Sequence, residues 1–262
     1  MKNKLGLILI LIVLLQIVVV QITSFFGTTT MFQYFKYIYT TTVYLSLSAL
    51  IWIERENLED FHLERLTLYI FIFSSLFRRR LGVNGEEYFL LVIGLTGIST
   101  IVAMFVNKSR IRIPKTNSGW VLTGLLVGII GTIPISLIQA WQSQLFNMWP
   151  YNSFLSDNIS LDIVRQIIYD LSFASLIEEM LFRGFIWGYL RKLGWAENRA
   201  FWVQGILFWV SHFGRLRTPL TFLLSIPLAT FIYSKLTLRS KQVFPSVVSH
   251  LIVNVATLYI TF

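Results

Sequence analysis

Long apolar runs, separated by short polar or basic segments, dominate the pattern along the chain. A helix needs about 20 apolar residues to cross the hydrocarbon core of a bilayer. Eight runs meet or approach this length: residues 5–26, 34–53, 88–106, 120–140, 161–191, 200–213, 218–238 and 243–262. A ninth run, residues 66–77, is shorter and suits a short, tilted or interfacial helix. No run alternates apolar and polar residues as the strands of a membrane barrel do. We therefore predict an all-α, polytopic integral membrane protein with about eight transmembrane helices, or nine if residues 66–77 also cross.

The segments between the runs predict where helices end and bend. Residues 54–65 form a polar, mostly acidic connector, and residues 141–160 are predicted as a loop or a surface helix. Residues 161–191 are predicted as one long helix, and Pro227 predicts a kink within residues 218–238. The chain starts like a signal peptide, with Lys2 and Lys4 before an apolar run. That run is long for a signal peptide and no small-residue cleavage site follows, so we predict a retained first span.

The composition supports the same class of protein. Of 262 residues, 55% are hydrophobic and only 13% are charged, where a soluble domain carries about 25% charged residues. A soluble fold could not hide this much apolar surface from water. Cysteine is absent from the sequence, which excludes disulfides, thiolate catalysis and cysteine-based zinc sites.

The basic residues gather in short clusters between the apolar runs. The formal net charge is +9, which in a soluble protein would suggest a nucleic acid as partner. Clusters that flank membrane spans instead set orientation and bind anionic lipid headgroups, so membrane lipid is the expected partner and nucleic acid is not. The loops at 108–115, 191–199 and 235–241 are predicted on the cytoplasmic side, and the orientation of the N-terminal half stays open. The clusters are Arg78–Arg80, Lys108 to Lys115, Arg191 with Lys192, and Lys235 to Lys241.

Two adjacent acids lie in the middle of the run 161–191. Glu178 and Glu179 project about 100° apart on a helix, so they serve different faces. Glu179 and Arg183 are four residues apart with the acid first, which is the favourable order for an ion pair. This spacing predicts a structural role for Glu179 and leaves Glu178 without a matched cation, as suits a general base. The alternative is that both acids pair with arginines and hold helices together.

Two of the three histidines also lie in apolar runs. His212 closes the run 200–213, and His250 shares a helical face with Asn254 in the last run. A carboxylate beside an imidazole can deprotonate a water, and an imidazole with an amide N–H can stabilise an oxyanion. Each histidine alone could instead be a satisfied core residue, because polar groups in lipid gather to satisfy one another. Together with Glu178 they predict a site for amide hydrolysis.

Other chemistries are less well matched to the residues. Glu178, His212 and His250 could ligate zinc, although no His-Glu-x-x-His motif is present. Ser211 and Ser249 each precede a motif histidine, and adjacent helical residues point about 100° apart, so neither is expected to be activated by its neighbour. Glycine-rich phosphate loops are absent, which argues against an ATPase. A transporter with a Glu–His proton relay is a further alternative.

In sequence order these residues form three motifs: Glu-Glu-x-x-x-Arg at 178–183, Phe-x-x-x-His at 208–212 and His-x-x-x-Asn at 250–254. They resemble the motifs of the CAAX protease and bacteriocin-processing (CPBP, or Abi) family of intramembrane endopeptidases. The resemblance covers residues 161–262, as a catalytic helical core, and leaves residues 1–160 as N-terminal transmembrane helices and connectors. It implies that Glu178 activates water together with His212, and that Glu179 and Arg183 support that helix.

The resemblance also implies that His250 and Asn254 form an oxyanion-binding pair. The implied mechanism needs no cofactor, but the family is commonly labelled as metalloproteases, so zinc held by Glu178, His212 and His250 stays open. The implied substrate is a membrane-associated, lipidated or leader-bearing peptide or protein, and the implied location is a bacterial cell membrane. A non-catalytic immunity or regulatory protein on the same fold is the alternative function. Phe182, Trp187 and Phe208 are candidate pocket walls, and the oligomeric state is not predicted.

Overall fold

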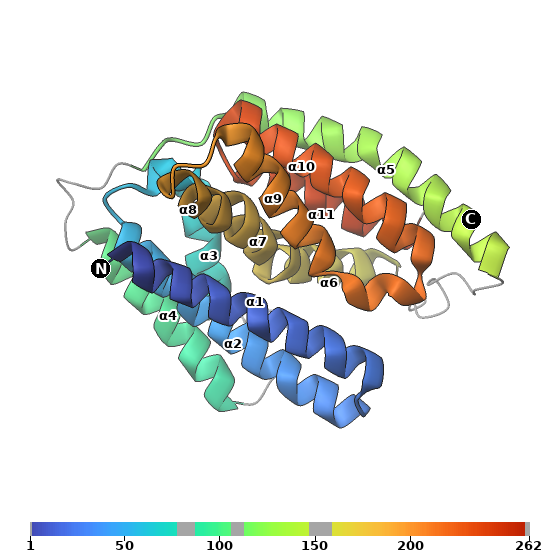
Figure 1. Ribbon diagram of the computed structural model, residues 1–262, viewed down its shortest axis with the longest axis horizontal. Coiled ribbons are helices and arrows are strands. Elements are labelled where there is room, and N and C mark those ends of the chain that lie inside the picture. The colour runs from blue at the N-terminus through green and yellow to red at the C-terminus, as the bar shows by residue number, and fades with distance from the viewer. Residues whose placement is uncertain (1, 78–86, 106–112, 147–158, 260–262) are drawn as a thin grey trace.

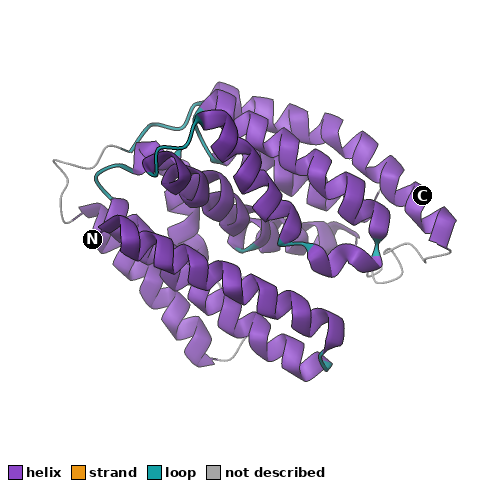
Figure 2. Cartoon of the chain, viewed as in Figure 1, coloured by secondary structure: helices purple, strands orange, loops and turns teal. Residues whose placement is uncertain are grey.

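A computed structural model describes residues 2–77, 87–105, 113–146 and 159–259. The described residues form helices joined by short loops, without strands, which confirms the all-α prediction (Figure 2). The elements of the N-terminal part are α1 (Lys2–Phe26), α2 (Thr29–Glu54), η1 (Leu58–Phe61), α3 (Arg65–Phe77), α4 (Glu87–Phe105) and α5 (Ser118–Phe146). Those of the C-terminal part are α6 (Ile159–Ser172), α7 (Ala174–Glu179), η3 (Met180–Ile186), α8 (Trp187–Lys192), α9 (Glu197–Val210), η4 (Phe213–Arg217), η5 (Thr221–Ser225), α10 (Ile226–Ser240) and α11 (Phe244–Tyr259).

Three described helices are long and apolar enough to cross a membrane: Lys4–Phe26, Ser118–Phe146 and Thr221–Ser240. Shorter apolar helices cover Arg65–Leu76, Leu90–Met104 and Phe244–Thr257. Large aliphatic side chains stay exposed on the outer faces, among them Leu11 and Ile130 at 63% and 65% exposure. Such surfaces suit contact with lipid. The chain is an integral membrane protein, and the number of eight or nine spans stays a prediction.

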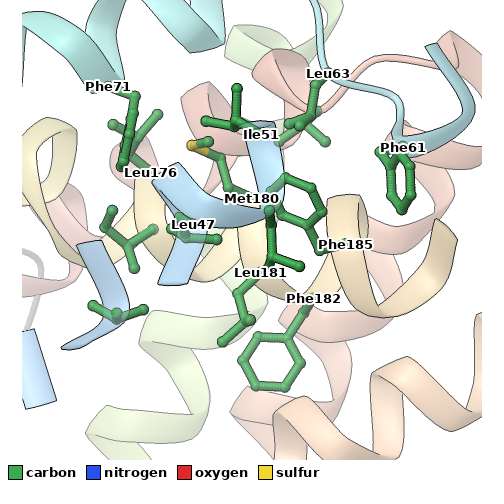
Figure 3. Packing of buried hydrophobic residues seen from close by; sticks show 14 of the residues in the cluster. Leu47, Ile51, Phe61, Leu63, Phe71, Leu176, Met180, Leu181, Phe182 and Phe185 are labelled. Carbon is green, nitrogen blue, oxygen red and sulfur yellow. The ribbon is translucent and has the colours of Figure 1, made fainter. Parts of the chain in front are cut away.

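The helices form two groups on either side of a central segment (Figure 1). Helices α1, α2 and α4 pack together on one side, and α5 packs along α11 beside α10 on the other. The segment α7–η3 lies between them and contributes the centre of the apolar core (Figure 3). Leu176, Met180 and Phe185 of this segment are fully buried, against Leu47 and Ile51 of α2. The helix that carries the two adjacent acids is thereby held at the middle of the molecule.

The run 161–191 is not the single helix that its periodicity predicts. The backbone of Phe173 leaves the helical region, with φ −148° and ψ −67°, and separates α6 from α7. Residues 180–186 then form a π-helix, a widened turn that is frequent at functional sites. The periodicity alone could not show the break, because apolar residues continue on both sides of it.

Two further boundaries differ from the predictions. Helix α5 continues to Phe146, so residues 141–146 are helical, whereas the rest of the predicted loop lies outside the described residues up to 158. His212 lies beyond the end of α9 and precedes η4, so it is not inside a helix. Pro227 stands in the first turn of α10 directly after the π-helix η5, and the kink predicted there stays a prediction. The basic clusters at 78–80 and 108–112 lie outside the described residues.

The connector 54–65 carries two buried acids, Glu54 and Glu64, which link it to the C-terminal part of the chain. The Glu54 carboxylate accepts hydrogen bonds from the Tyr189 hydroxyl at 2.7 Å and from Lys192 Nζ at 2.5 Å. The Glu64 carboxylate accepts from the backbone N–H groups of Val243 at 3.1 Å and Phe244 at 2.9 Å. Free N–H groups at the start of a helix need such acceptors. Glu64 therefore fixes the start of α11, the helix that carries His250 and Asn254.

Candidate active site

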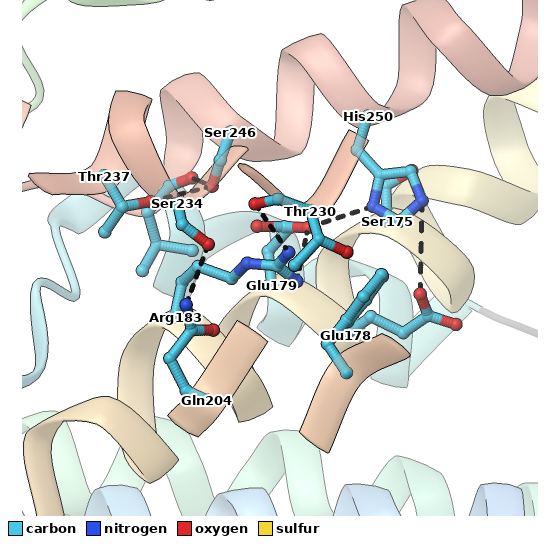
Figure 4. A network of polar contacts seen from close by, with 12 residues as sticks. Ser175, Glu178, Glu179, Arg183, Gln204, Thr230, Ser234, Thr237, Ser246 and His250 are labelled. Carbon is cyan, nitrogen blue, oxygen red and sulfur yellow. Dashed lines mark hydrogen bonds and ion pairs between the residues drawn. The ribbon is translucent and has the colours of Figure 1, made fainter. Parts of the chain in front are cut away.

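Segment α7–η3 supplies both adjacent acids and the arginine of the first motif. The ion pair predicted from the spacing is present: Arg183 Nη1 lies 3.2 Å from Glu179 Oε1, and both side chains are fully buried. Glu179 Oε1 also lies 3.0 Å from His250 Nδ1, so this carboxylate joins the helix to α11 (Figure 4). The Arg183 guanidinium stacks over the Phe208 ring, 4.0 Å from its centroid. Glu179 is thus tied to two partners in the protein interior.

Glu178 has different surroundings. Its side chain is 24% exposed, and its Oε2 lies 3.7 Å from His212 Nε2 and 4.0 Å from His250 Nε2. These distances are too long for direct hydrogen bonds. Figure 4 shows Glu178 on the opposite side of His250 from Glu179. The structure therefore brings Glu178, His212 and His250 together, and no arginine among the described residues forms an ion pair with the Glu178 carboxylate.

The hydrogen bonds define which nitrogen of each imidazole carries a proton. His212 Nδ1 lies 2.8 Å from the backbone oxygen of Phe208, and a carbonyl oxygen can only accept. His250 Nδ1 faces the Glu179 carboxylate, which likewise accepts. Nδ1 is therefore the protonated nitrogen in both rings, and both Nε2 atoms are directed at Glu178. An imidazole oriented in this way through Nδ1 is the usual arrangement of a catalytic or ligating histidine.

Ser211 lies closer to His212 than the spacing of adjacent helical residues predicts. Ser211 Oγ lies 3.2 Å from His212 Nδ1, because α9 ends at Val210 and the 100° rule of a helix no longer applies. The Ser211 hydroxyl donates to the Phe208 backbone oxygen at 2.6 Å. Since His212 Nδ1 carries a proton, it cannot take one from Ser211. This contact does not create an activated serine.

A cavity of about 1060 Å³ opens onto the site. Its wall includes Glu178, His212, His250 and Asn254, so all three motifs face one space. The apolar part of the lining comes from Ile17, Val20, Phe32, Phe173, Phe182, Phe208, Ile226 and Val253, and the polar part from Gln21, Lys36, Tyr39, Gln139, Gln142, Gln166, Arg215 and Tyr233, among others. Phe182 and Phe208 are pocket walls as predicted. Trp187 is not, because it is fully buried and packs against Phe201.

Comparison with protein families gives the same reading as the motifs. Residues 160–256 match the model of the family described as type II CAAX prenyl endopeptidase Rce1-like. This segment of the chain is similar to that family. The match confirms the resemblance to CAAX-type membrane proteases for these residues, and the apolar helices agree with a membrane protein. No curated protein and no solved structure matches the chain. The division into residues 1–160 and 161–262 stays a prediction.

Within the Rce1-like segment, Asn254 has a partner that the sequence reasoning missed. Its Nδ2 donates to Asp170 Oδ1 at 2.7 Å, whereas His250, the neighbour expected from the motif, bonds to Glu179. Asp170 is fully buried near the end of α6 and also accepts from Ser175 Oγ and Gln166 Nε2, at 2.8 and 2.7 Å. The position of Asp170 in an apolar run could have indicated such a contact, since an ionisable group in a membrane span is costly unless it has partners.

Glu178, His212 and His250 are also the candidate ligands of a zinc ion. Within the part of the chain that the structure describes, no three side chains of His, Cys, Asp or Glu are arranged as metal ligands. Glu178, His212 and His250 converge, but their atoms do not form a ligand set as they stand.

Proposed function

We propose that the protein is an intramembrane endopeptidase in which Glu178 takes a proton from the water that attacks a peptide carbonyl. The observation that supports this most is the unequal state of the two adjacent acids. Glu179 is neutralised by Arg183 and fully buried, whereas Glu178 reaches the cavity between two imidazole Nε2 atoms. A free carboxylate at an apolar wall is the state that a general base requires.

In the proposed reaction, a water is hydrogen-bonded to both Glu178 Oε2 and His212 Nε2. The lone pair of His212 Nε2 accepts one hydrogen bond of this water, since Nδ1 holds the ring proton on the Phe208 carbonyl. As the water oxygen bonds to the peptide carbon, its second proton passes to Glu178. Glu178 then gives that proton to the peptide nitrogen while the C–N bond breaks. The products are a new carboxyl terminus and a new amine, and Glu178 returns to its starting state.

The oxyanion of the tetrahedral intermediate needs hydrogen-bond donors in the same cavity. Asn254 can offer the amide hydrogen that Asp170 does not use. His250 can donate through Nε2 when the ring carries its second proton, because Nδ1 is held by Glu179. One such donor typically contributes about 10²- to 10³-fold to kcat.

The cavity supports a substrate that is partly apolar and partly polar. Aromatic and aliphatic side chains line one part of it, and amide and basic side chains line another. We therefore propose a peptide or protein substrate that reaches the site from the membrane, either lipidated or with an apolar segment of its own. The bacterial cell membrane is the proposed location, as the motif resemblance implies. Lipid is the other proposed partner, in contact with the exposed apolar faces.

A peptide-cleavage experiment in ¹⁸O-labelled water tests the proposal. The purified chain in detergent micelles is incubated with a library of apolar peptides, half of which carry a farnesylated cysteine, and hydroxylamine is added. Direct attack by water yields carboxyl termini that contain ¹⁸O and no hydroxamates, because no acyl-enzyme forms. The Glu178→Gln variant should give no products above background. Glu197→Gln, the same change at a 37% exposed side chain, serves as the matched control and should cleave like the wild type.

Each other outcome selects a different function. Hydroxamate products would indicate a covalent acyl intermediate and contradict water activated by Glu178. Equal cleavage by the wild type and Glu178→Gln would attribute the hydrolysis to another group. If no peptide is cleaved while the host loses peptide-antibiotic protection on deletion of the gene, and Glu178→Gln restores that protection, the function is non-catalytic immunity.

A further inference from the structure

A third carboxylate near the site, Asp170, has no ion-pair partner among the residues that the structure describes. Its side chain is fully buried. It accepts hydrogen bonds from three neutral donors: Asn254 Nδ2, Ser175 Oγ and Gln166 Nε2. A buried carboxylate without a cation is expensive, and its cost is met here by hydrogen bonds alone. Glu179, by contrast, has Arg183.

The break between α6 and α7 forms this arrangement. Phe173 interrupts the helix three residues after Asp170, and Ser175 in the first turn of α7 then donates back to Asp170 Oδ1 at 2.8 Å. In an unbroken helix, residues five apart do not face each other in this way. Helix α6 also packs against α11, where Asn254 lies. Because the backbone is irregular here, the Asp170 carboxylate accepts hydrogen bonds from residues of three helices, α6, α7 and α11.

The contact with Asp170 decides how the Asn254 amide is oriented. A side-chain amide can be placed with its oxygen and nitrogen exchanged, but the exchanged form would put the amide oxygen against the carboxylate. Asp170 excludes that form at 2.7 Å. Of the two amide hydrogens, one is used by Asp170 and the other is left for a different acceptor. Asn254 lines the same cavity as Glu178 and His212, so the second hydrogen can serve an acceptor in that cavity.

We propose that Asp170 is the positioning residue that holds Asn254 as a hydrogen-bond donor toward the cavity. This inference rests on the proposed function for its catalytic consequence, but the orientation of the amide can be measured without any substrate. Asp170 itself touches neither water nor peptide in the proposed reaction. Without its carboxylate, the amide can turn over and present its oxygen, which repels an oxyanion.

The kinetic test is a double-mutant cycle, because a merely structural role would add to the loss at Asn254 whereas positioning acts through it. Asn254→Ala should lower kcat about 10²- to 10³-fold, the usual effect of one oxyanion donor. Asp170→Ala should lower kcat about 10- to 100-fold and change KM by less than about 3-fold. In the Asn254→Ala background, Asp170→Ala should have no further effect on kcat. Multiplicative losses would overturn the proposal.

Two further variants distinguish a loss of amide positioning from a loss of folded protein. Asp170→Asn preserves the volume and one oxygen that can accept from Asn254, so its kcat should stay within about 10-fold of the wild type, as a rescue by a conservative change. Ser175→Ala removes another donor to the same carboxylate and leaves the Asn254 contact in place. It should retain the wild-type kcat. A loss at Ser175→Ala as large as at Asp170→Ala would show that the integrity of the network, and not the contact with Asn254, is what matters.

The spectroscopic test uses the full chain in micelles with ¹⁵N-labelled asparagine. The side-chain signals of Asn254 are identified by their loss in Asn254→Ala. One amide proton bonded to a carboxylate should lie downfield of the other in the wild type, and this separation should collapse in Asp170→Ala. An unchanged Asn254 signal overturns the proposal whether or not the protein cleaves peptides. Failure of the proposed function is recognised separately, because the wild type and Glu178→Gln would then not differ in cleavage.

Discussion

Replacing Arg183 by Met tests the buried ion pair on which the division between the two acids depends. Methionine keeps a long side chain in the π-helix but removes the charge from Glu179, whose exposure is 0%. The contact with His250 Nδ1 would then remain at the Glu179 carboxylate, and no positive guanidinium would face it. An uncompensated charge would remain in the interior of the molecule.

The geometry gives the size of the effect. Two unit charges at the 3.2 Å separation of Arg183 and Glu179 attract by about 5 kcal/mol at an effective dielectric constant of about 20. Measured losses on breaking a buried pair are about 3–5 kcal/mol. The stacking of Arg183 on Phe208 at 4.0 Å is lost as well and is worth about 1–2 kcal/mol. We expect a total loss of about 4–7 kcal/mol, which lowers Tm by roughly 8–28 °C for a chain of this size.

Thermal unfolding in detergent micelles measures this loss. The same change at an exposed pair, Arg165→Met, is the control, because Arg165 is 65% exposed beside Asp162 and should shift Tm by no more than about 3 °C. The double variant Glu179→Gln/Arg183→Met should recover most of the lost stability, since neutral groups of similar volume often replace a buried pair without loss. A Tm of Arg183→Met within about 3 °C of the wild type would refute the reasoning.

Three other measurements follow from the structure. Burial raises the pKa of Glu64 from 4.5 to about 7, so its contribution to stability is present below pH 4.5 and is lost as the pH rises through 7. Burial lowers the pKa of His62 from 6.5 to about 3, so its contribution to stability is present above pH 6.5 and is lost as the pH falls through 3. Glu64→Gln leaves the His62 effect and should make Tm rise with pH between 4.5 and 6.5, whereas His62→Asn leaves the Glu64 effect and should make Tm fall over the same range. The opposite slopes would contradict both assignments. Gly124→Leu should destabilise the protein by about 1–3 kcal/mol or more, because a Cβ there would lie 2.3 Å from the backbone oxygen of Pro245, where α5 meets α11; an unchanged Tm would show that the two helices are not in close contact. Peptide cleavage should continue after treatment with a strong chelator, and elemental analysis should then show less than one metal ion per chain. A loss of cleavage that added zinc restores would favour the metal alternative.

Local patterns in the sequence predicted much of the fold and part of the site. The apolar runs predicted the helices because lipid requires backbone groups to be satisfied within each segment. The Glu179–Arg183 pair followed from a four-residue spacing and is present at 3.2 Å. Even the π-helix between them did not separate these two side chains.

The features that the sequence did not predict depend on contacts between distant residues. Asp170 meets Asn254 across 84 positions, and only the packing of α6 on α11 brings them together. The position of Ser211 beside His212 arises where a helix ends, and an apolar pattern does not mark that end. Trp187 was expected in the pocket because it is large and aromatic, yet its ring faces the other side of the segment, toward Phe201.

The most direct test of the proposed mechanism is the kcat of Glu178→Gln on a peptide that the wild type cleaves. Glutamine keeps the size of the side chain between His212 and His250 but cannot take a proton from water. If Glu178 is the general base, kcat falls about 10²- to 10⁴-fold while Tm stays within a few degrees of the wild type. A folded Glu178→Gln variant that keeps kcat within 10-fold of the wild type would contradict that role.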